Sequence, residues 1–355
     1  MFMLRNLWVA PLAMLTIGAA QPERQGFDMA VLHPPHAVAI GGHRLLVYEL
    51  HLTNFAGAEL HPTRIEALDA TTGAVIASLE GAALDRAIGG PGHKSGSATA
   101  KPGEHLVVYW EISLPLADPI PRRLRHRLVF DGASVSGGDV VLTREPLPQF
   151  APPLRGGPWT AVYDPALERG HRRMVYAVDG VARVPGRHAI DWFRAGGGDG
   201  RGADVLAVAD AIVAASRDDM DEPAAGVAAR PISLADGTGN FVALRLANGS
   251  FAVYEHLARG VRVKPGQTVR RGDVIARLGA TGHASKPHLH FHVADALSSL
   301  ASEGLPFRLS GMTVLGHFPT VFAAADGGTW ASEPPRRLAA PADDMPAPNV
   351  VIRFD

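Results

Sequence analysis

The chain has 355 residues, and its 34 Lys and Arg nearly balance its 35 Asp and Glu, for a formal net charge of −1 at pH 7. This balance excludes a strongly basic nucleic-acid-binding protein and an acidic solvating tail. The absence of cysteine excludes disulfides, thiolate metal ligands and a cysteine nucleophile. With 39 Gly and 28 Pro, many short strands are more to be expected than long helices.

The first twenty residues have the pattern of a secretory signal peptide. Arg5 supplies a positive charge, residues 7–18 are almost wholly apolar, and small residues at 18–20 precede Gln21. An uncleaved membrane anchor is the alternative, but the apolar run is shorter than the ~20 residues of a spanning helix. We therefore expect residues 1–20 to be a signal peptide. The mature protein is then exported, periplasmic or extracellular, without stable membrane insertion.

Residues 25–147 are predicted to form an immunoglobulin-like β-sandwich. Short runs of alternating apolar and polar residues are separated by Gly, Pro, Asp and Asn, which is typical of such sandwiches. Glu49, His51 and Glu111 are polar members of these runs, and we expect them on the solvent-facing side of half-buried strands. The predicted strands cover residues 45–52, 64–68, 75–79, 105–112, 125–130 and 140–143.

Residues 148–158 are predicted to be a linker between domains. The stretch from 145 to 158 is rich in Pro and Gly, so we expect it to hold no regular element. Residues 159–310 are predicted to be a second, mostly β domain, which makes the fold class all-β. Residues 311–355 are predicted to be a looser C-terminal extension whose residues 350–354 form a final edge strand.

Two hairpins are predicted in the second domain from their two-residue turns. Residues 174–178 and 181–184 flank Asp179-Gly180, and residues 241–246 and 250–255 flank Asn248-Gly249. Residues 204–214 are expected to be a buried strand pair.

Three histidines alternate in the segment Pro-His-Leu-His-Phe-His at 287–292. On a strand, His288, His290 and His292 would face one side, with Leu289 and Phe291 buried on the other. Packing does not account for such a cluster, because an unpaired imidazole is costly to bury. The segment therefore predicts a metal or catalytic site.

A hydrolytic zinc site needs three protein ligands and one open position. Zinc lowers the pKa of water and polarises the carbonyl to be cut. The chain has no His-Glu-x-x-His motif, so the ligands must come from separate strands. Asp191 is an attractive partner, because it lies in the strand-like segment Arg-His-Ala-Ile-Asp-Trp at 187–192.

The region 157–307 resembles the lysostaphin-type (LytM-like) zinc metalloendopeptidases, a family of peptidoglycan hydrolases. The matching segments follow the family's order and are Ala-Ile-Asp (189–191), Gly-Asn-Phe-Val (239–242), Tyr-Glu-His-Leu (254–257) and residues 263–292, which begin with Val-Lys-Pro-Gly-Gln and include Pro-His-Leu-His-Phe. The resemblance implies a compact β fold with its site in a groove between two sheets. It also implies Zn²⁺ as the cofactor and peptidoglycan peptides as the substrate.

The resemblance further implies roles for individual residues. Asp191 and His290 would be zinc ligands, and His256 and His288 would be catalytic residues that flank the reacting water. The family usually has its first zinc ligand, a His, four residues before the Asp. This chain has Arg187 there, which cannot be a ligand because it stays protonated and offers no lone pair.

His171 is the candidate for the third zinc ligand. In a branch of the family, a Gly-His-Arg-Arg segment precedes an Arg-Phe/Tyr-Ala-Ile-Asp segment, and residues 170–173 and 187–191 match that layout. The branch implies that His171 replaces the missing ligand. An extended hairpin would place His171 opposite His188, with both facing away from Asp191, unless a bulge at 185–186 resets the register. His188 is the rival ligand, although the branch gives its position a packing role.

Two other histidines near the motifs have open or minor roles. His292 stands where the family usually has Glu, and it can orient a ligand, bind metal or be an exposed strand residue. His283 is expected to be a solvated loop residue near the entrance of the groove.

The leading hypothesis is an exported zinc metalloendopeptidase that hydrolyses peptide bonds of peptidoglycan by metal-activated water. The alternative is a catalytically defective peptidase-like domain that binds cell wall or regulates another wall hydrolase, and Arg187 is its best support. A zinc enzyme that acts on a protein outside the wall is a third reading.

Overall fold

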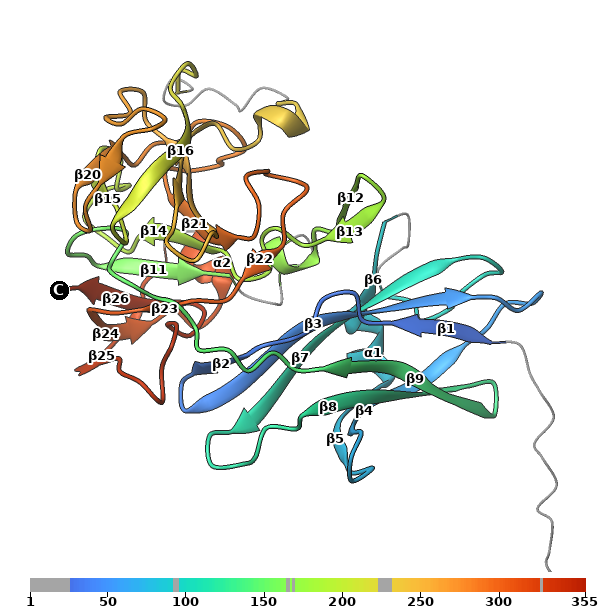
Figure 1. The fold of residues 1–355 in the computed structure, drawn as a ribbon. Coiled ribbons are helices and arrows are strands. Elements are labelled where there is room, and N and C mark those ends of the chain that lie inside the picture. The colour runs from blue at the N-terminus through green and yellow to red at the C-terminus, as the bar shows by residue number, and fades with distance from the viewer. Residues whose placement is uncertain (1–25, 92–95, 164–166, 168–169, 223–231, 326–327) are drawn as a thin grey trace, which may run out of the picture.

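The computed structural model describes residues 26–91, 96–163, 167, 170–222, 232–325 and 328–355. Figure 1 shows two lobes in which nearly every element is a strand, so the predicted all-β fold class is confirmed. The predicted signal peptide at residues 1–20 lies outside the described residues. In the described part of the chain, no helix has the length and apolar character needed to cross a membrane.

The N-terminal lobe consists of two antiparallel sheets. In the first, β3 pairs with β1, β2 and β7, and β7 also pairs with β6. Its strands are β1 (Phe27–Ala30), β2 (Ala37–Ile40), β3 (His43–Asn54), β6 (Ile88–Gly89) and β7 (His105–Pro115). The second has the order β5-β4-β8-β9, with β4 (Pro62–Asp69), β5 (Val75–Glu80), β8 (Arg123–Phe130) and β9 (Ala133–Val141). Helix α1 (Gly81–Ala87) joins β5 to β6.

The two sheets of this lobe pack around one apolar core. Leu50 of β3 and Leu128 of β8 are fully buried members of the same cluster, so the sheets face each other as a β-sandwich. All six predicted strands overlap strands of the structure, and β9 begins earlier than predicted, at Ala133. The immunoglobulin-like topology stays a prediction.

The C-terminal lobe is built on an eleven-stranded sheet with the order β19-β16-β17-β18-β21-β14-β11-β26-β24-β25, in which β22 also pairs with β21. Its strands are β11 (Trp159–Val162), β14 (Ile190–Arg194), β16 (Ala211–Arg217), β17 (Asn240–Arg245), β18 (Phe251–Leu257), β19 (Thr268–Val269), β21 (Leu289–Ala294), β22 (Gly304–Leu305), β24 (Met312–His317), β25 (Ala331–Arg337) and β26 (Val350–Phe354). Three two-stranded sheets accompany it: β10 (Gln149–Phe150) with β23 (Arg308–Leu309), β12 (Tyr176–Val178) with β13 (Val181–Arg183), and β15 (Asp204–Leu206) with β20 (Val274–Arg277). The short helices are η1 (His171–Arg173), η2 (Leu234–Asp236) and α2 (Val321–Ala325).

The side chains of β21 alternate between two faces of the strand, as predicted. Leu289, Phe291 and Val293 are fully buried in the core of this lobe. The intervening His290 and His292 therefore lie on the opposite side of the strand. The predicted hairpin around Asn248-Gly249 is confirmed as β17 and β18, and the one around Asp179-Gly180 as β12 and β13.

Three predictions about connecting segments are wrong. The linker at 148–158 does hold a regular element, because β10 lies in it and pairs in parallel with β23. Residues 350–354 form β26, which lies between β11 and β24 and is not an edge strand. The two strands in 204–214 do not pair with each other, because β15 pairs with β20, and β16 pairs with β17 and β19. Residues 311–355 thus share their sheet with residues 159–310, while the domain boundaries stay predictions.

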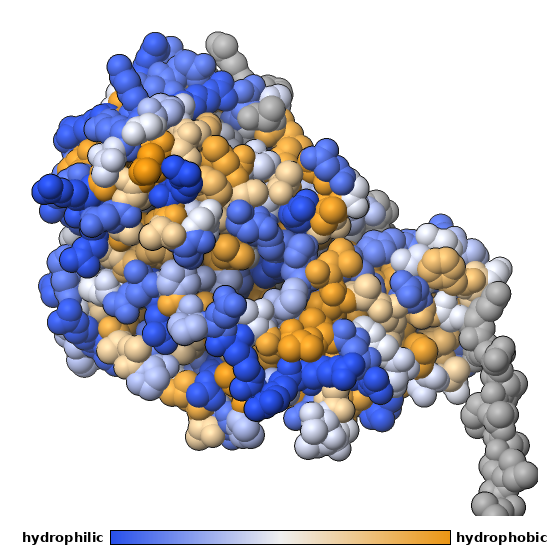
Figure 2. Space-filling model, viewed as in Figure 1, coloured by the Kyte–Doolittle hydropathy of each residue, from blue (hydrophilic) through white to orange (hydrophobic). Residues whose placement is uncertain are grey.

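Glu49 and His51 of β3 are buried, against prediction. Glu49 is 5% exposed and His51 is 8% exposed. Glu49 forms an ion pair with the buried Arg187, which also pairs with Glu303. A buried carboxylate needs such a partner, and here the C-terminal lobe supplies it. Figure 2 shows a band of hydrophobic side chains between the two lobes on the same view.

Candidate metal centre

Three neighbouring strands place a row of polar side chains on one side of the large sheet. Asp191 of β14 lies directly opposite His290 of β21, and His290 lies directly opposite Glu255 of β18. Directly opposite residues on antiparallel strands share a face, so these three side chains project together.

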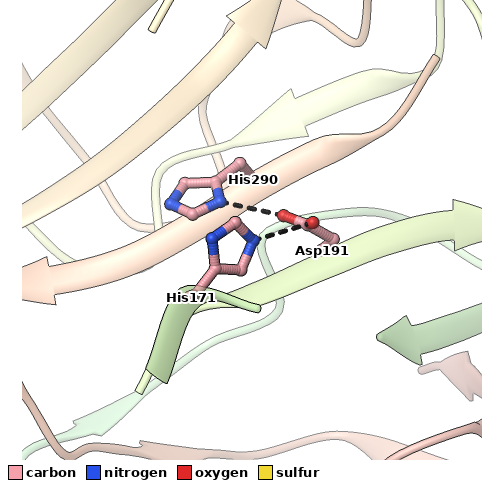
Figure 3. Close-up of side chains that lie close together, drawn as sticks. All are labelled: His171, Asp191 and His290. Carbon is pink, nitrogen blue, oxygen red and sulfur yellow. Dashed lines mark hydrogen bonds and ion pairs between the residues drawn. The ribbon is translucent and has the colours of Figure 1, made fainter. Parts of the chain in front are cut away.

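His171 joins this row from outside the sheet. Its Nε2 donates to Oδ2 of Asp191 at 2.8 Å, and His290 Nδ1 donates to Oδ1 at 2.8 Å (Figure 3). The candidate ligand atoms of these three residues lie within 4.8 Å of one another. The expectation that His171 would face away from Asp191 is wrong, because the hairpin ends at Tyr176 and His171 lies in the 3₁₀ turn η1.

Arg187 and His188 point away from the row. Arg187 is held by Glu49 and Glu303. His188 is buried, and burial, with Arg187 and Arg172 nearby, lowers its pKa well below the usual value. Residues 186–189 form a turn in which Ala189 N donates to Gly186 O, in place of the bulge suggested at 185–186. In the described part of the chain, His188 belongs to neither group of side chains that could hold a metal.

Asp191 is an ionised carboxylate surrounded by imidazoles. Burial opposes its ionisation, but His171 and His288 and the hydrogen bonds from His171 and His290 hold its pKa well below the usual range. Burial likewise opposes protonation of His290, whereas Glu255 and Asp191 raise its pKa above the usual value. Burial raises the pKa of Glu255 above its usual value, so Asp191 is the main negative charge that attracts a cation to this point.

His256 and His288 lie beside the row, and backbone carbonyls fix their orientation. His256 Nδ1 donates to Thr281 O at 2.9 Å, and His288 Nδ1 donates to Lys286 O at 2.8 Å. A carbonyl only accepts, so the proton of each neutral ring is on Nδ1 and the lone pair is on Nε2. Burial lowers the pKa of both imidazoles, and both are therefore neutral near pH 7.

Other contacts hold these two rings in the site. Their centroids are 4.6 Å apart, and the ring of His288 stacks on Phe193 at 4.5 Å. His288 Nε2 lies 3.6 Å from Asp191 Oδ1. His256 has a backbone φ of +61°, a region that residues other than Gly rarely adopt and that is common at functional sites.

The site opens into a cleft of about 230 Å³. Because the left-handed backbone at His256 interrupts strand alternation, the consecutive residues Glu255 and His256 both line it. His283 also lines it, from a loop where its Nε2 lies 3.1 Å from Ile232 O.

A second group, made of Glu255, His290 and His292, shares one residue with the first. His292 is buried, and its Nδ1 lies 3.0 Å from Nε2 of His290. Of the roles left open for His292, the exposed one is wrong, and its contact suits orientation of His290. Glu255 lies in the Tyr-Glu-His-Leu motif, but the resemblance implied no role for it. The contact of Phe193 with His288 could not be predicted, because no spacing in the sequence indicates it.

The donors of the first group suit a zinc ion. Two imidazole nitrogens and one carboxylate oxygen form a ligand set that zinc uses in hydrolytic sites, where a fourth position stays open. The cleft lies on the open side of the group, since His171 and His290 both line it. The structure thus brings together the three predicted ligands and the two predicted catalytic histidines.

Residues 197–301 match the model of Peptidase family M23, so this segment is similar to a domain of that family. The resemblance predicted from the sequence is confirmed at this level. The matched residues include His256, His288 and His290, whereas His171 and Asp191 precede them.

Two curated relatives match shorter segments. A protein of Haemophilus influenzae named "Uncharacterized metalloprotease" is 40% identical over 93 residues, which are 26% of this chain and 19% of the relative. The peptidoglycan DD-endopeptidase ShyC of Vibrio cholerae is 43% identical over 53 residues, which are 15% of this chain and 12% of the relative. The chain thus spans less than a fifth of the length of these relatives. Among solved structures, the catalytic domain of lysostaphin from Staphylococcus simulans is 20% identical with a TM-score of 0.26, covering 42% of this chain and 88% of that one.

Proposed function

We propose that this chain is an exported zinc metalloendopeptidase that hydrolyses peptide bonds of bacterial peptidoglycan. The observation that carries the proposal is the convergence of His171, Asp191 and His290 beside a cleft that both histidines line. The family M23 match supports a peptidase, and the name of the Haemophilus influenzae relative supports dependence on a metal. The name of the Vibrio cholerae relative supports peptidoglycan as the substrate class. The sequence pattern of residues 1–20 supports export.

In this proposal, His171, Asp191 and His290 hold the metal, and His256 and His288 move protons. A zinc ion, when bound, supplies a Lewis acid that lowers the pKa of water and polarises the peptide carbonyl. The lone pairs on Nε2 of His256 and His288 can accept the proton of the attacking water. Once protonated, the same nitrogen can donate to the developing oxyanion or to the leaving amine. Burial favours this role, because a neutral imidazole is the form that accepts a proton.

Digestion of purified peptidoglycan tests the proposal. We expect the protein to release peptide fragments, to stop when a chelator removes the metal, and to resume when zinc is restored. His256→Ala and His288→Ala should each bind zinc but lose about 10²- to 10⁴-fold in rate, the usual contribution of general acid–base catalysis. His61→Ala, at an exposed position of the N-terminal lobe, is the matched control and should keep full activity.

The alternative is a defective, wall-binding domain on the same scaffold. Its best support was Arg187, which stands where the family usually has a zinc ligand. In the structure, ion pairs with Glu49 and Glu303 account for this arginine, and His171 occupies the place beside Asp191. Zinc-loaded protein that binds peptidoglycan without releasing fragments would establish the alternative. Cleavage of other peptides but not of peptidoglycan would establish a zinc enzyme with a substrate outside the wall.

A further inference from the structure

The turn that carries His171 is attached mainly to the other lobe. Helix η1 is only three residues long and lies outside the large sheet. Its residues Arg172 and Arg173 extend toward β7 and α1 of the N-terminal lobe. In the described part of the chain, the hydrogen bonds from these two guanidinium groups go to Glu111 and to the carbonyl of Arg86.

Arg172 provides the first attachment. Its side chain is 10% exposed, and its Nη1 donates to Oε2 of Glu111 at 2.6 Å. A nearly buried guanidinium depends on such a partner, because the charge would otherwise be left without compensation. On its other side the guanidinium lies 5.0 Å from the ring centroid of Tyr163. Glu111 therefore fixes the residue that directly follows His171.

Arg173 provides the second attachment. Its carbonyl accepts a hydrogen bond from the hydroxyl of Tyr109 at 3.1 Å, and its guanidinium lies 5.2 Å from the centroid of the same ring. Its Nη2 also donates to Arg86 O at 2.7 Å. Tyr109 thus contacts both the backbone and the side chain at the end of η1.

The segment on the other side of His171 is attached to the N-terminal lobe as well. A Cβ atom on Gly186 would lie 2.7 Å from Cβ of His171, so the backbone of the two residues is in close contact. The next residue, Arg187, donates from Nε to Oε1 of Glu49 in β3 at 3.2 Å. Helix η1, which contains His171, and residues 186–187, which pack against it, therefore both form ion pairs with the N-terminal lobe.

We propose that the N-terminal β-sandwich positions a metal ligand: through Tyr109, Glu111 and Glu49 it holds His171 against Asp191. The metal centre of the C-terminal lobe then depends on both lobes, although the ligands themselves all belong to one of them. Tyr109 and Glu111 are positioning residues, because neither lines the cleft and neither belongs to the groups of side chains that could hold a metal. This inference rests on the proposed function, since it concerns the same metal.

The test is the affinity of the full-length protein for zinc, measured by competition with a chelator. Glu111→Gln keeps the size of the side chain but removes the charge that holds Arg172, and we expect the dissociation constant for zinc to rise roughly 10- to 100-fold, as for other residues that orient ligands. Tyr109→Phe loses only the hydroxyl that binds Arg173 O, and its dissociation constant should rise in the same direction. Should E111Q fail to fold, Y109F alone carries the test.

A control variant and a double variant test whether the loss of zinc affinity acts through His171. Asp343→Asn makes the same change of carboxylate to amide in another contact between the lobes, where Asp343 Oδ1 accepts from Gly41 N at 3.0 Å. Its affinity for zinc should match that of the wild type. In the background of His171→Ala, E111Q should weaken zinc binding no further, because the residue through which it acts is gone.

The outcomes separate this inference from the proposed function. Wild-type protein that binds no zinc would overturn both. Wild-type protein that binds zinc, with E111Q and Y109F unchanged, would overturn only the positioning role. An equal loss in D343N, or a full further loss in the H171A background, would also overturn it, because the effect would then be a general loosening of the lobes.

Discussion

His171 reaches Asp191 from a turn that begins twenty residues earlier in the chain. It shares the carboxylate of Asp191 with His290, and each histidine bonds one oxygen. His171 binds Oδ2 and His290 binds Oδ1, each at 2.8 Å. The carboxylate therefore bridges the two imidazoles, whose ring centroids are 4.5 Å apart, and both lie close enough to share a cation. His188 is nearer to Asp191 in sequence but is buried among Arg187 and Arg172.

The two rival ligands give opposite expectations for metal content. His171→Ala removes one of three donors and should reduce the zinc bound per chain to a small fraction after dialysis. His188→Phe fills the same buried space with an apolar ring and should keep about one zinc per chain. Elemental analysis of untagged protein measures both, and the reverse pattern would assign the third ligand to His188.

His126, in the N-terminal lobe, is a buried imidazole with both nitrogens bonded. Tyr48 OH donates to its Nε2 at 2.8 Å, and its Nδ1 donates to Gly138 O at 3.0 Å. Burial lowers its pKa from 6.5 to about 4. The unfolded chain therefore binds a proton at this residue between these two pH values, while the folded protein does not.

Stability should consequently fall as the pH is lowered from about 6.5 toward 4. Because the pKa of His126 is lower in the folded state, its contribution is fully present above 6.5 and is lost below it. Between pH 7 and pH 5, it should reduce the free energy of unfolding by about 2 kcal/mol. Urea unfolding at the two pH values measures this loss, which should be smaller by that amount in His126→Gln. An equal loss in both proteins would contradict it.

Much of the site at this scale follows from residue types and spacing. The alternating histidines at 288–292 and the carboxylate in an apolar run at 191 indicated the strands and the face that they share. The orientation of His171 did not follow, because strand alternation was extended past the point where the hairpin ends. A 3₁₀ turn of three residues has no periodicity that would reveal it.

At the scale of elements, β14, β21 and β18 carry the row of polar side chains, and η1 packs beside these strands. The close contact between Gly186 and His171 determines how near η1 can come. Any side chain at residue 186 would meet the Cβ of His171 at 2.7 Å, closer than carbon atoms approach without displacement. This contact explains why the turn at this point contains Gly.

Gly186→Ala should therefore displace η1 and weaken zinc binding more than it weakens the fold. We expect a loss of affinity of about tenfold or more, in line with other changes that misplace a ligand. Competition with a chelator measures it, and urea unfolding of the metal-free protein reports the fold. Gly57→Ala, where the added methyl meets nothing within 4 Å, is the control and should match the wild type in both measurements. Equal zinc affinity in G186A would show that η1 tolerates the shift.

The hairpins were predictable, and the strands formed by the connections were not. Asp179-Gly180 and Asn248-Gly249 are turn pairs with a local preference for the bend that a hairpin needs. Strand β10 depends on a parallel pairing with β23, more than 150 residues later. Two residues are too few for a pattern of apolar and polar alternation, and the prolines around them are typical of a segment without regular structure.

At the scale of the whole molecule, one buried arginine ties the two lobes together. Arg187 pairs with Glu49 of β3 and with Glu303 next to β22, and all three side chains are buried. Sequence alternation placed Glu49 on a solvent-facing side. That reasoning treats each sheet alone, and it fails where a second lobe covers the polar face.

Arg187→Met should destabilise the protein strongly, because it leaves two buried carboxylates without their cation. Removing one partner of a buried ion pair usually costs about 3–5 kcal/mol. Urea unfolding of the metal-free protein should show a loss of this size. The triple variant R187M/E49Q/E303Q should recover part of it, since the uncompensated charges are then absent. No recovery would mean that packing of the arginine, and not its charge, accounts for the loss.

The position of β26 has a consequence for the synthesis of the chain. Strand β11 ends at Val162, and its neighbour β26 begins only at Val350. At about 5–20 residues per second, the ribosome needs roughly 10 to 40 seconds to make the chain between them. During that time one side of β11 has unpaired peptide groups, which can bind the wrong strand of the same or another nascent chain. We expect a chaperone that binds exposed strand edges to protect this side of β11 until β26 arrives.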